Sequence, residues 1–234
     1  LMLVTDDRLV RGRDLVALAL AAERGGATSV QLRLKEASPR ALAEFARSLV
    51  AALGIPVLVN DRPDVALAAG AAGVHLGPED LSPGLTRRVA PPGFIIGASV
   101  GSAAEAAAAA DADYWGIGPW RMTETKADAG AALRAAGFRE LAALAGGRPC
   151  IAIGGVRPED VAEVVGAGGA GVAVVSGAVT EPTRVGSATS PYPTEVASTS
   201  PASPAVATRP QSHDHTASGS AALWTGHKPQ NPSR

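Results

Sequence analysis

The sequence has few aromatic residues, one cysteine and almost no net charge. Aromatic residues make up 3% of the 234 positions, which argues against the base-stacking surfaces of RNA-recognition sheets. The formal net charge is −1, so we expect no general attraction to nucleic acid or to an anionic membrane. Cys150 is the single cysteine, which excludes an intramolecular disulfide framework.

Signals for export and for membrane insertion are also missing. No basic segment followed by an apolar one opens the chain, and no apolar run reaches the ~18 residues that a membrane helix needs. We therefore expect a cytoplasmic protein that has neither a membrane nor a nucleic acid as its partner.

The composition changes near residue 182. The last 52 residues, from Thr183 to Arg234, contain 9 Ser, 7 Thr and 7 Pro and show no apolar periodicity. Such a segment cannot bury enough apolar surface to offset the entropy lost on ordering. The sequence therefore predicts a folded domain over residues 1–180 and a disordered Ser/Thr/Pro-rich tail over residues 181–234.

Before that change, short β-branched runs alternate with longer stretches rich in Ala and Leu. The expected strands are Leu1–Thr5, Ser29–Leu34, Val57–Asn60, Gly73–Leu76, Ile95–Ser99, Tyr114–Gly118, Cys150–Ile153 and Gly171–Val175. The expected helices are Asp14–Arg24, Pro39–Leu53, Pro63–Ala69, Leu85–Val89, Ala103–Ala110, Ala131–Ala145 and Pro158–Val165. Eight strands in strict alternation with helices predict an α/β fold, the (β/α)₈ TIM barrel. A doubly wound open sheet would require G-x-G-x-x-G after the first strand, where Thr5-Asp6-Asp7-Arg8 stands instead.

The predicted barrel lacks a clear last helix. That helix should follow Ser176, but GAVTEPTRVGSATSP holds about one turn before Pro182. Its absence predicts exposed apolar surface at the seam between the last and first strands. Three explanations stay open: another chain covers the seam in a homo-oligomer, the domain is marginally stable, or an aberrant tail has replaced a native helix.

Polar residues gather where the second, third and fourth strands end, which is where a barrel places its active site. Alternation puts Gln31, Arg33 and Lys35 on the inward face of the second strand. Inward cations are costly unless an anion meets them, so they predict a phosphate site in preference to an internal salt bridge. Asp61 and Asp80 follow the next two strands, and two carboxylates beside a phosphate suit Mg²⁺.

Each of these carboxylates also has a simpler interpretation when it is taken alone. Asp61 could be a turn residue before a proline, and Asp80 could cap a helix. Their position beside the Arg33 and Lys35 pair favours the metal site. For His75, within the fourth strand, we expect a packed, hydrogen-bonded side chain in preference to a catalytic one.

A second anion pocket is predicted where the later strands end. Ser99 follows the fifth strand, Thr123–Lys126 form a loop after the sixth, and Gly154-Gly155 and Ser176 follow the last two. No Ser/His/Asp arrangement is visible, which argues against a nucleophilic serine. Two anion pockets without a nucleophile suggest that a metal assists a leaving group to depart while two phosphorylated molecules are joined.

Seven motifs spread over residues 1–178 resemble, in order and spacing, those of the thiamine phosphate synthase family: QLRLK, VLVND, GVHLGPEDL, IIGAS, YWGIGPWRMTETK, AIGGV and GVAVVSG. The resemblance implies a transferase with a (β/α)₈ barrel that couples hydroxymethylpyrimidine pyrophosphate with hydroxyethylthiazole phosphate and releases pyrophosphate. In the implied mechanism pyrophosphate departs first, with the help of Mg²⁺. The thiazole nitrogen then attacks the pyrimidine cation.

The resemblance also implies a role for each candidate residue. The pyrimidine pyrophosphate would be held by Gln31, Arg33, Lys35 and Asn60. Mg²⁺ would be ligated by Asp61 and Asp80. The catalytic residues that bind the departing pyrophosphate would be Ser99 and Lys126. The thiazole phosphate would be held by Thr123, Thr125, Gly154, Gly155, Val175 and Ser176.

The chain departs from the family pattern at two short segments. Trp120-Arg121-Met122 replaces an aliphatic–aromatic pair and a proline, and Val100-Gly101 follows the serine of GAS where a threonine and another polar residue are usual. Both departures leave the pocket residues in place and can alter loop shape.

Two alternative functions stay open. One is a thiazole tautomerase-like relative, which tends to carry a histidine in the turn after the sixth strand and to lack part of the pyrophosphate and metal set. Here Pro119 occupies that turn and the set is whole, so the synthase is favoured. The other is a phosphate-binding barrel inactivated by its C-terminus, which a thermal melt would identify.

Overall fold

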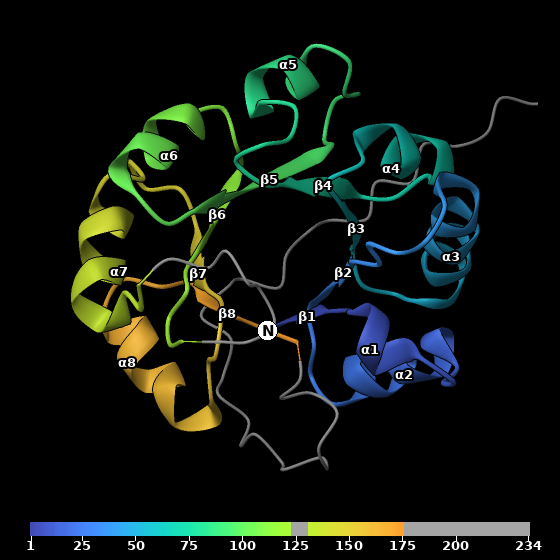
Figure 1. Ribbon diagram of the computed structural model, residues 1–234, viewed down its shortest axis with the longest axis horizontal. Coiled ribbons are helices and arrows are strands. Elements are labelled where there is room, and N and C mark those ends of the chain that lie inside the picture. Colours follow the sequence, from blue (N-terminus) through green and yellow to red (C-terminus); the bar gives the residue numbers. More distant parts are fainter. Residues whose placement is uncertain (123–130, 176–234) are drawn as a thin grey trace, which may run out of the picture. The chain divides into compact units, whose positions relative to one another are not determined.

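Eight parallel strands close into a barrel in chain order, with β8 paired to β1. The computed structural model describes residues 1–122 and 131–175. The strands form a ring and the helices lie outside it (Figure 1). The strand bounds are β1 Met2–Val4, β2 Ser29–Leu32, β3 Val57–Asn60, β4 Gly73–Leu76, β5 Ile95–Val100, β6 Tyr114–Ile117, β7 Cys150–Ala152 and β8 Gly171–Val174. The predicted TIM barrel is confirmed.

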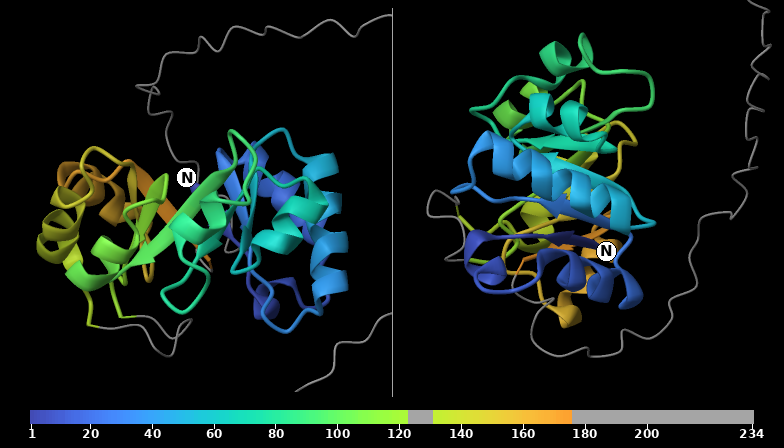
Figure 2. Two further views of the ribbon diagram at one scale, coloured as in Figure 1. Left: turned by 90° about the horizontal axis from the view of Figure 1, so that it is seen from above. Right: turned by 90° about the vertical axis from the view of Figure 1, so that its right-hand side faces the viewer.

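The helices occupy the connections between successive strands. Their bounds are α1 Asp7–Val10, α2 Leu15–Arg24, α3 Pro39–Ala52, α4 Pro63–Ala69, α5 Pro83–Arg87, α6 Ala103–Ala108, α7 Arg134–Ala143, the 3₁₀ turn η1 Pro158–Asp160, and α8 Val161–Gly166. The short helix α1 was not predicted, although Asp6 caps it by accepting a hydrogen bond from the Arg8 N–H. Two further views place the helices on the outer side of the strands (Figure 2).

Helix starts follow from serine caps and from prolines in the first turn. Ser38 accepts from the Ala41 N–H and precedes Pro39, where the missing proline N–H needs no partner. The predicted helix Leu85–Val89 begins earlier than expected because Ser82 caps it, with a proline directly after the cap.

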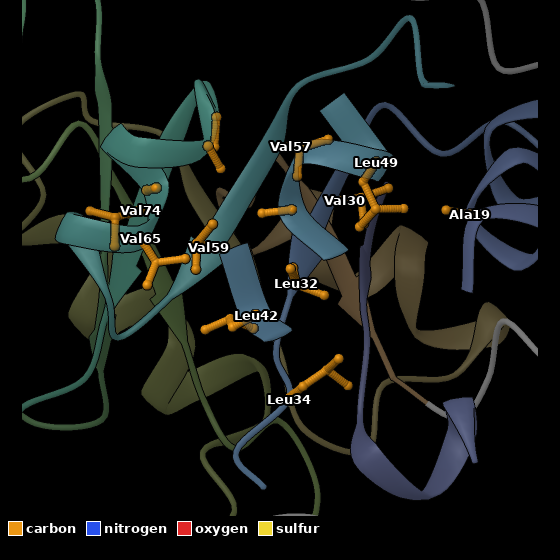
Figure 3. Packing of buried hydrophobic residues seen from close by; sticks show 14 of the residues in the cluster. Ala19, Val30, Leu32, Leu34, Leu42, Leu49, Val57, Val59, Val65 and Val74 are labelled. Carbon is orange, nitrogen blue, oxygen red and sulfur yellow. The ribbon is translucent and has the colours of Figure 1, made fainter. Parts of the chain in front are cut away.

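The outward residues of the strands pack against the helices. Alternation along β2 sends Val30 and Leu32 outward and Gln31 inward, and both apolar side chains are fully buried. Burial of each such side chain contributes about 1.5–3 kcal/mol. Figure 3 shows this layer, in which Val30, Leu32, Val57, Val59 and Val74 lie beside Ala19, Leu42, Leu49 and Val65 of the helices.

The inside of the barrel combines a buried apolar cluster with polar side chains. Met2, Val4, Leu58, Tyr114 and Ala173 form a buried cluster inside the ring. Polar inward residues lie directly beside this cluster, because Gln31 is in register with Val4 and Leu58. Together with polar residues at the strand ends, they line one cavity.

The seam beside β1 differs from the expectation. Leu3, the outward residue of β1, is buried and packs with Leu15 and Ala19 of α2, so β1 does not expose the apolar surface that we predicted there. The segment where an eighth helix would follow, and the predicted tail over residues 181–234, lie outside the described residues. Among residues 1–122 and 131–175, none of the helices has the length and apolar composition needed to span a bilayer.

Candidate active site

A cavity of about 340 Å³ lies at the C-terminal ends of the strands. Its lining brings together ten of the predicted site residues: Gln31, Arg33, Lys35, Asn60, Asp61, Asp80, Ser99, Gly154, Gly155 and Val175. The other four, Thr123, Thr125, Lys126 and Ser176, lie outside the described residues. Side chains from β2 through β8 therefore meet in one space.

Two amide side chains from neighbouring strands are hydrogen-bonded inside this cavity. Gln31 is buried, and its Nε2 donates to Oδ1 of Asn60 at 2.8 Å. The contact holds both side chains in one orientation. Because it engages Oδ1 of Asn60, the Nδ2 group of Asn60 is the donor that this residue can offer a ligand.

The two predicted cations lie at different depths. Arg33 is mostly buried, and its Nη1 lies 3.0 Å from Oδ2 of Asp6. The internal salt bridge that we set aside in favour of an anion site therefore exists at Arg33. It engages one of the five N–H donors of the guanidinium, so the others can still meet a phosphate.

The position of Lys35 differs from the prediction that it lies on the second strand. β2 ends at Leu32, so Arg33 and Lys35 both lie after the strand and not on it, and the side chain of Lys35 is 56% exposed. Asp7 of α1 holds this loop, because its carboxylate accepts hydrogen bonds from the N–H groups of Lys35 and Glu36 at 2.8 and 3.2 Å.

Asp6 and Asp7 contact residues of the candidate site, and sequence reasoning missed both. The signal was present, because both directly follow the first strand, at the end of the barrel where the other polar residues gather. One orients the cation Arg33 and the other shapes the loop that carries Lys35. The connection after β1 thus supports the cationic side of the cavity.

Asp61 and Asp80 lie together at the ends of β3 and β4. Asp61 adopts a left-handed backbone with φ 64°, a conformation that Asp tolerates better than most residues. Burial and then contact with the Asp80 carboxyl raise the pKa of Asp61 to about 6. Lys35, whose Nζ lies 3.8 Å from Oδ2 of Asp61, acts in the opposite direction.

The helix-cap interpretation of Asp80 is wrong, because Ser82 caps α5. Oδ2 of Asp80 instead accepts from the Gly77 N–H at 2.6 Å, which turns the carboxyl toward the cavity mouth near Asp61. A neighbouring carboxyl that raises the pKa of Asp61 in this way marks a place that favours a cation.

The described residues contain no cluster of three or more His, Cys, Asp or Glu that could enclose a metal. A pair of carboxylates fits Mg²⁺, which is usually held by one or two carboxylates, water and substrate phosphate. The donor set therefore fits Mg²⁺ better than a metal that needs an all-protein cage.

Ser99 is hydrogen-bonded to His75. Its Oγ lies 3.0 Å from Nε2 of His75, and Nδ1 of the same ring lies 2.8 Å from Oη of Tyr114. His75 is buried, so the predicted packed and hydrogen-bonded state of this histidine is confirmed. The structure thus brings a serine and a histidine together, which the sequence pattern did not indicate. The third group is a phenol where a hydrolytic triad has a carboxylate.

Gly154-Gly155 form the turn after β7, with φ values of 87° and 66°. A Cβ on Gly154 would lie 2.9 Å from Cβ of Pro119, and one on Gly155 would lie 2.9 Å from Cβ of Arg121. Both positions require glycine for conformation and for space. The backbone N–H groups of such a turn are available to a phosphate.

The unusual segment Trp120-Arg121-Met122 is anchored away from the cavity. Trp120 is fully buried with its ring edge-on to Phe138, and Arg121 forms a two-point ion pair with the buried Asp160. The Arg121 guanidinium lowers the pKa of Asp160 to about 2. Pro119 still lines the cavity, so this departure from the family pattern leaves the inner side of the turn in place.

The second departure, Val100-Gly101, lies at the cavity wall. Val100 extends β5 by one residue beyond its predicted end, and the Gly101 N–H donates to Oε2 of Glu105 at 2.5 Å. Glu105 also lines the cavity, and its carboxylate was missed in the sequence because it lies inside an alanine-rich helix.

Comparisons with known proteins show the family to which the chain belongs. A family model described as thiamine monophosphate synthase matches residues 1–178. The thiamine-phosphate synthase of Xanthobacter autotrophicus is 50% identical over 181 residues, covering 75% of this chain and 85% of that protein. The thiamine-phosphate synthase of Azorhizobium caulinodans is 49% identical over 184 residues, with the same coverage of 75% and 85%.

A solved structure also resembles the chain. Thiamine phosphate pyrophosphorylase from Pyrococcus furiosus superimposes with a TM-score of 0.67 at 35% identity, covering 78% of this chain and 89% of that one. The chain belongs to the thiamine monophosphate synthase family.

Proposed function

We propose that this cavity couples hydroxymethylpyrimidine pyrophosphate with hydroxyethylthiazole phosphate to form thiamine phosphate and pyrophosphate. The transferase activity follows from the family, as the names of the relatives state. The observation that carries the assignment of the site is a single cavity lined by a cationic side, a carboxylate pair and a glycine turn. Two anionic substrates and one cation require these three features.

We infer that Asp61 and Asp80 would hold Mg²⁺ in the part of the cavity that receives the pyrophosphate. The support is that the two carboxyls lie together and that contact with the Asp80 carboxyl, after burial, raises the pKa of Asp61. The ion, when bound, supplies charge neutralisation at the departing pyrophosphate. Lys35 beside Asp61 adds a second positive charge at the same place.

Each remaining side chain has a proposed part in the reaction. The pyrimidine methylene–oxygen bond breaks heterolytically, and its electron pair leaves with pyrophosphate, which Arg33, Lys35 and Ser99 receive. The lone pair of the thiazole nitrogen then forms the new bond to carbon. The Gln31–Asn60 pair orients the pyrimidine ring, and charge stabilisation with positioning supplies most of the rate.

The thiazole phosphate is assigned to the opposite wall. Gly154 and Gly155 present backbone N–H groups there, beside Val175 of the last connection. Thr123, Thr125, Lys126 and Ser176, which lie outside the described residues, stay proposed partners of the two phosphates. Both substrates are charged small molecules, and we propose that the protein acts on them in the cytoplasm.

The tautomerase alternative would isomerise the thiazole phosphate without the pyrimidine. The residues from Gly118 to Met122 contain no histidine, and the carboxylate and cation set lines the cavity. The members of that set within the described residues, Arg33, Lys35, Asp61 and Asp80, thus favour coupling. Incubation of the protein with the thiazole phosphate alone should therefore leave that compound unchanged in its NMR spectrum.

The test of the metal assignment is a matched pair of substitutions. Asp61→Asn removes one proposed ligand, whereas Asp64→Asn changes a carboxylate that pairs with Arg62 on the exposed side of α4. Coupling activity should fall by at least ~10²-fold in the first variant and stay within ~2-fold in the second. Equal activity of Asp61→Asn and wild type at saturating Mg²⁺ would refute the assignment.

A further inference from the structure

A hydrogen-bonded chain of three side chains crosses the inside of the barrel. It starts at Tyr114 on β6, passes through His75 on β4 and ends at Ser99 on β5. Tyr114 and His75 are buried, and Ser99 lines the cavity. These three hydrogen-bonded side chains therefore connect the apolar interior of the barrel to the cavity that we assign to the substrates.

Two glycines, Gly97 and Gly116, leave space for these three side chains. His75, Gly97 and Tyr114 stand at the same level on β4, β5 and β6, in register. A Cβ on Gly97 would lie 2.2 Å from Cζ and 2.4 Å from Oη of Tyr114, and one on Gly116 would lie 3.1 Å from Cε1 of His75. The strand between the two rings therefore has to be without a side chain at that level.

The direction of the hydrogen bonds follows from the surroundings of the phenol. Tyr114 belongs to the apolar cluster of Met2, Val4, Leu58 and Ala173. Among the described residues, His75 Nδ1 is the acceptor found for its hydroxyl hydrogen. If the bonds ran the other way, from Ser99 to His75 and from His75 to Tyr114, the phenol hydrogen would point into apolar side chains. An unsatisfied buried donor is unfavourable, so the phenol donates.

This direction determines the state of the imidazole. Because Nδ1 accepts from Tyr114, the ring hydrogen of the neutral imidazole resides on Nε2. Nε2–H then donates to Oγ of Ser99. The Ser99 hydroxyl thereby has an occupied lone pair, and its own hydrogen is directed to the cavity. Burial also raises the pKa of Tyr114, which keeps the phenol protonated.

We propose that Tyr114 is a positioning residue, which holds His75 in its Nε2–H tautomer so that Ser99 donates its hydroxyl hydrogen to the departing pyrophosphate. The proposal rests on the proposed function for the identity of the anion. Ser99 touches the leaving group, whereas His75 and Tyr114 act through it. Tyr114, His75 and Ser99 thus form a fixed set of hydrogen-bond donors that needs no rearrangement during the reaction.

The kinetic test compares kcat with KM. Tyr114→Phe should lower kcat by ~10-fold or more. Loss of a residue that orients a ligand-binding side chain typically lowers activity by this factor. KM for the pyrimidine pyrophosphate should change by less than ~3-fold, because the ground-state contacts of Arg33 and Lys35 persist. Ile151→Val, a truncation in the same interior layer without a hydrogen bond, serves as the control for destabilisation alone and should leave kcat unchanged.

Two variants at His75 test its contact with Ser99 separately from its contact with Tyr114. In His75→Gln the amide NH₂ can take the place of Nε2–H, so it should retain most of kcat and should make Tyr114→Phe silent in the double mutant. In His75→Asn the shorter amide reaches toward Tyr114 but not Ser99, so kcat should fall as far as in Ser99→Ala. Additive losses in the His75→Gln, Tyr114→Phe double mutant would overturn the proposal.

A spectroscopic readout separates the failure of this proposal from failure of the proposed function. In ¹⁵N-histidine-labelled protein, His75 should show a protonated Nε2 and an unprotonated Nδ1, identified by loss of its signals in His75→Gln. Tyr114→Phe should shift the tautomer equilibrium. A protonated Nδ1 in the wild type overturns the proposal whether or not the protein couples the substrates, and absence of coupling with the Nε2–H tautomer present refutes the function alone.

Discussion

The guanidinium of Arg33 is held by Asp6, with Nη1 3.0 Å from Oδ2, although the two residues are 27 positions apart in the chain. The carboxylate orients the cation from the side of β1, while the other N–H groups of Arg33 remain available to the pyrophosphate. A residue in the first connection therefore determines how a cation from the second one meets its anion.

Replacing Asp6 with Asn should weaken substrate binding. The amide keeps a hydrogen-bond acceptor but loses the charge, so Arg33 is held less firmly, and KM for the pyrimidine pyrophosphate should rise ~10-fold. Steady-state kinetics with the thiazole phosphate saturating would measure this change. The control is Glu36→Gln, which removes an exposed pair with Arg11 at 3.8 Å and should have no effect. An unchanged KM in Asp6→Asn would contradict the role of Asp6.

The Asp160–Arg121 pair makes stability depend on pH in the acid range. Arg121 lowers the pKa of Asp160 from 3.8 to about 2, so the stabilising interaction is complete above the ordinary value and is lost as pH falls through about 2. Asp160→Asn should lower Tm at pH 7, and its difference from wild type should shrink between about pH 4 and pH 2. Melts recorded across this range would show the convergence.

Glu159→Gln is the control for that experiment. Glu159 pairs with Arg157 at 3.8 Å, and both side chains are mostly exposed, so Tm should hardly change. If Asp160→Asn and Glu159→Gln had equal effects at pH 7, the buried pair would contribute no more to stability than an exposed one.

Gly154→Ala should disturb both stability and the thiazole phosphate site. The added methyl lies 2.9 Å from Cβ of Pro119 and the residue keeps a left-handed φ, so unfolding should become easier by more than about 1 kcal/mol. KM for the thiazole phosphate should rise, while KM for the pyrimidine pyrophosphate should change less.

Gly166→Ala provides the comparison. Gly166 ends α8, and a Cβ there meets open space, so the change should be neutral or stabilise by about 0.5–1 kcal/mol. Denaturant unfolding of both variants gives the difference. Equal stability of the two would show that the turn after β7 accommodates a side chain.

Mg²⁺ and pyrophosphate should stabilise the fold together. A ligand that binds only the native state raises Tm by mass action, so the rise with both should exceed the sum of the separate rises. Asp80→Asn should abolish that excess without changing Tm in the absence of ligands by more than a few degrees. An excess that survives in Asp80→Asn would exclude this carboxylate from the metal site.

Much of the site could be predicted because it depends on local pattern. The period of two along a strand places Gln31, Asn60 and Ser99 at the inner strand ends, whatever the strand's neighbours are. The eight strands themselves follow from alternation of short β-branched runs with helical stretches. These predictions needed no knowledge of which residues meet across the barrel.

What could not be predicted depends on contacts between distant segments. Neither the partner of Arg33 nor that of Arg121 can be read from local spacing, because each ion pair joins two different connections. The contact of His75 with Tyr114 likewise joins β4 to β6 and requires a glycine, Gly97, on the strand between them. Lys35 was placed on a strand because strand ends are decided by pairing with the neighbouring strand, which ceases at Leu32.

The most direct test is the coupling reaction of the full 234-residue chain. Purified protein would be given both substrates and Mg²⁺, and thiamine phosphate and pyrophosphate would be quantified together. Equal amounts of the two products, formed only with both substrates and lost on adding EDTA, are the predicted result. A protein that melts cooperatively yet forms no thiamine phosphate, or one that forms it equally well in EDTA, would contradict the proposed reaction.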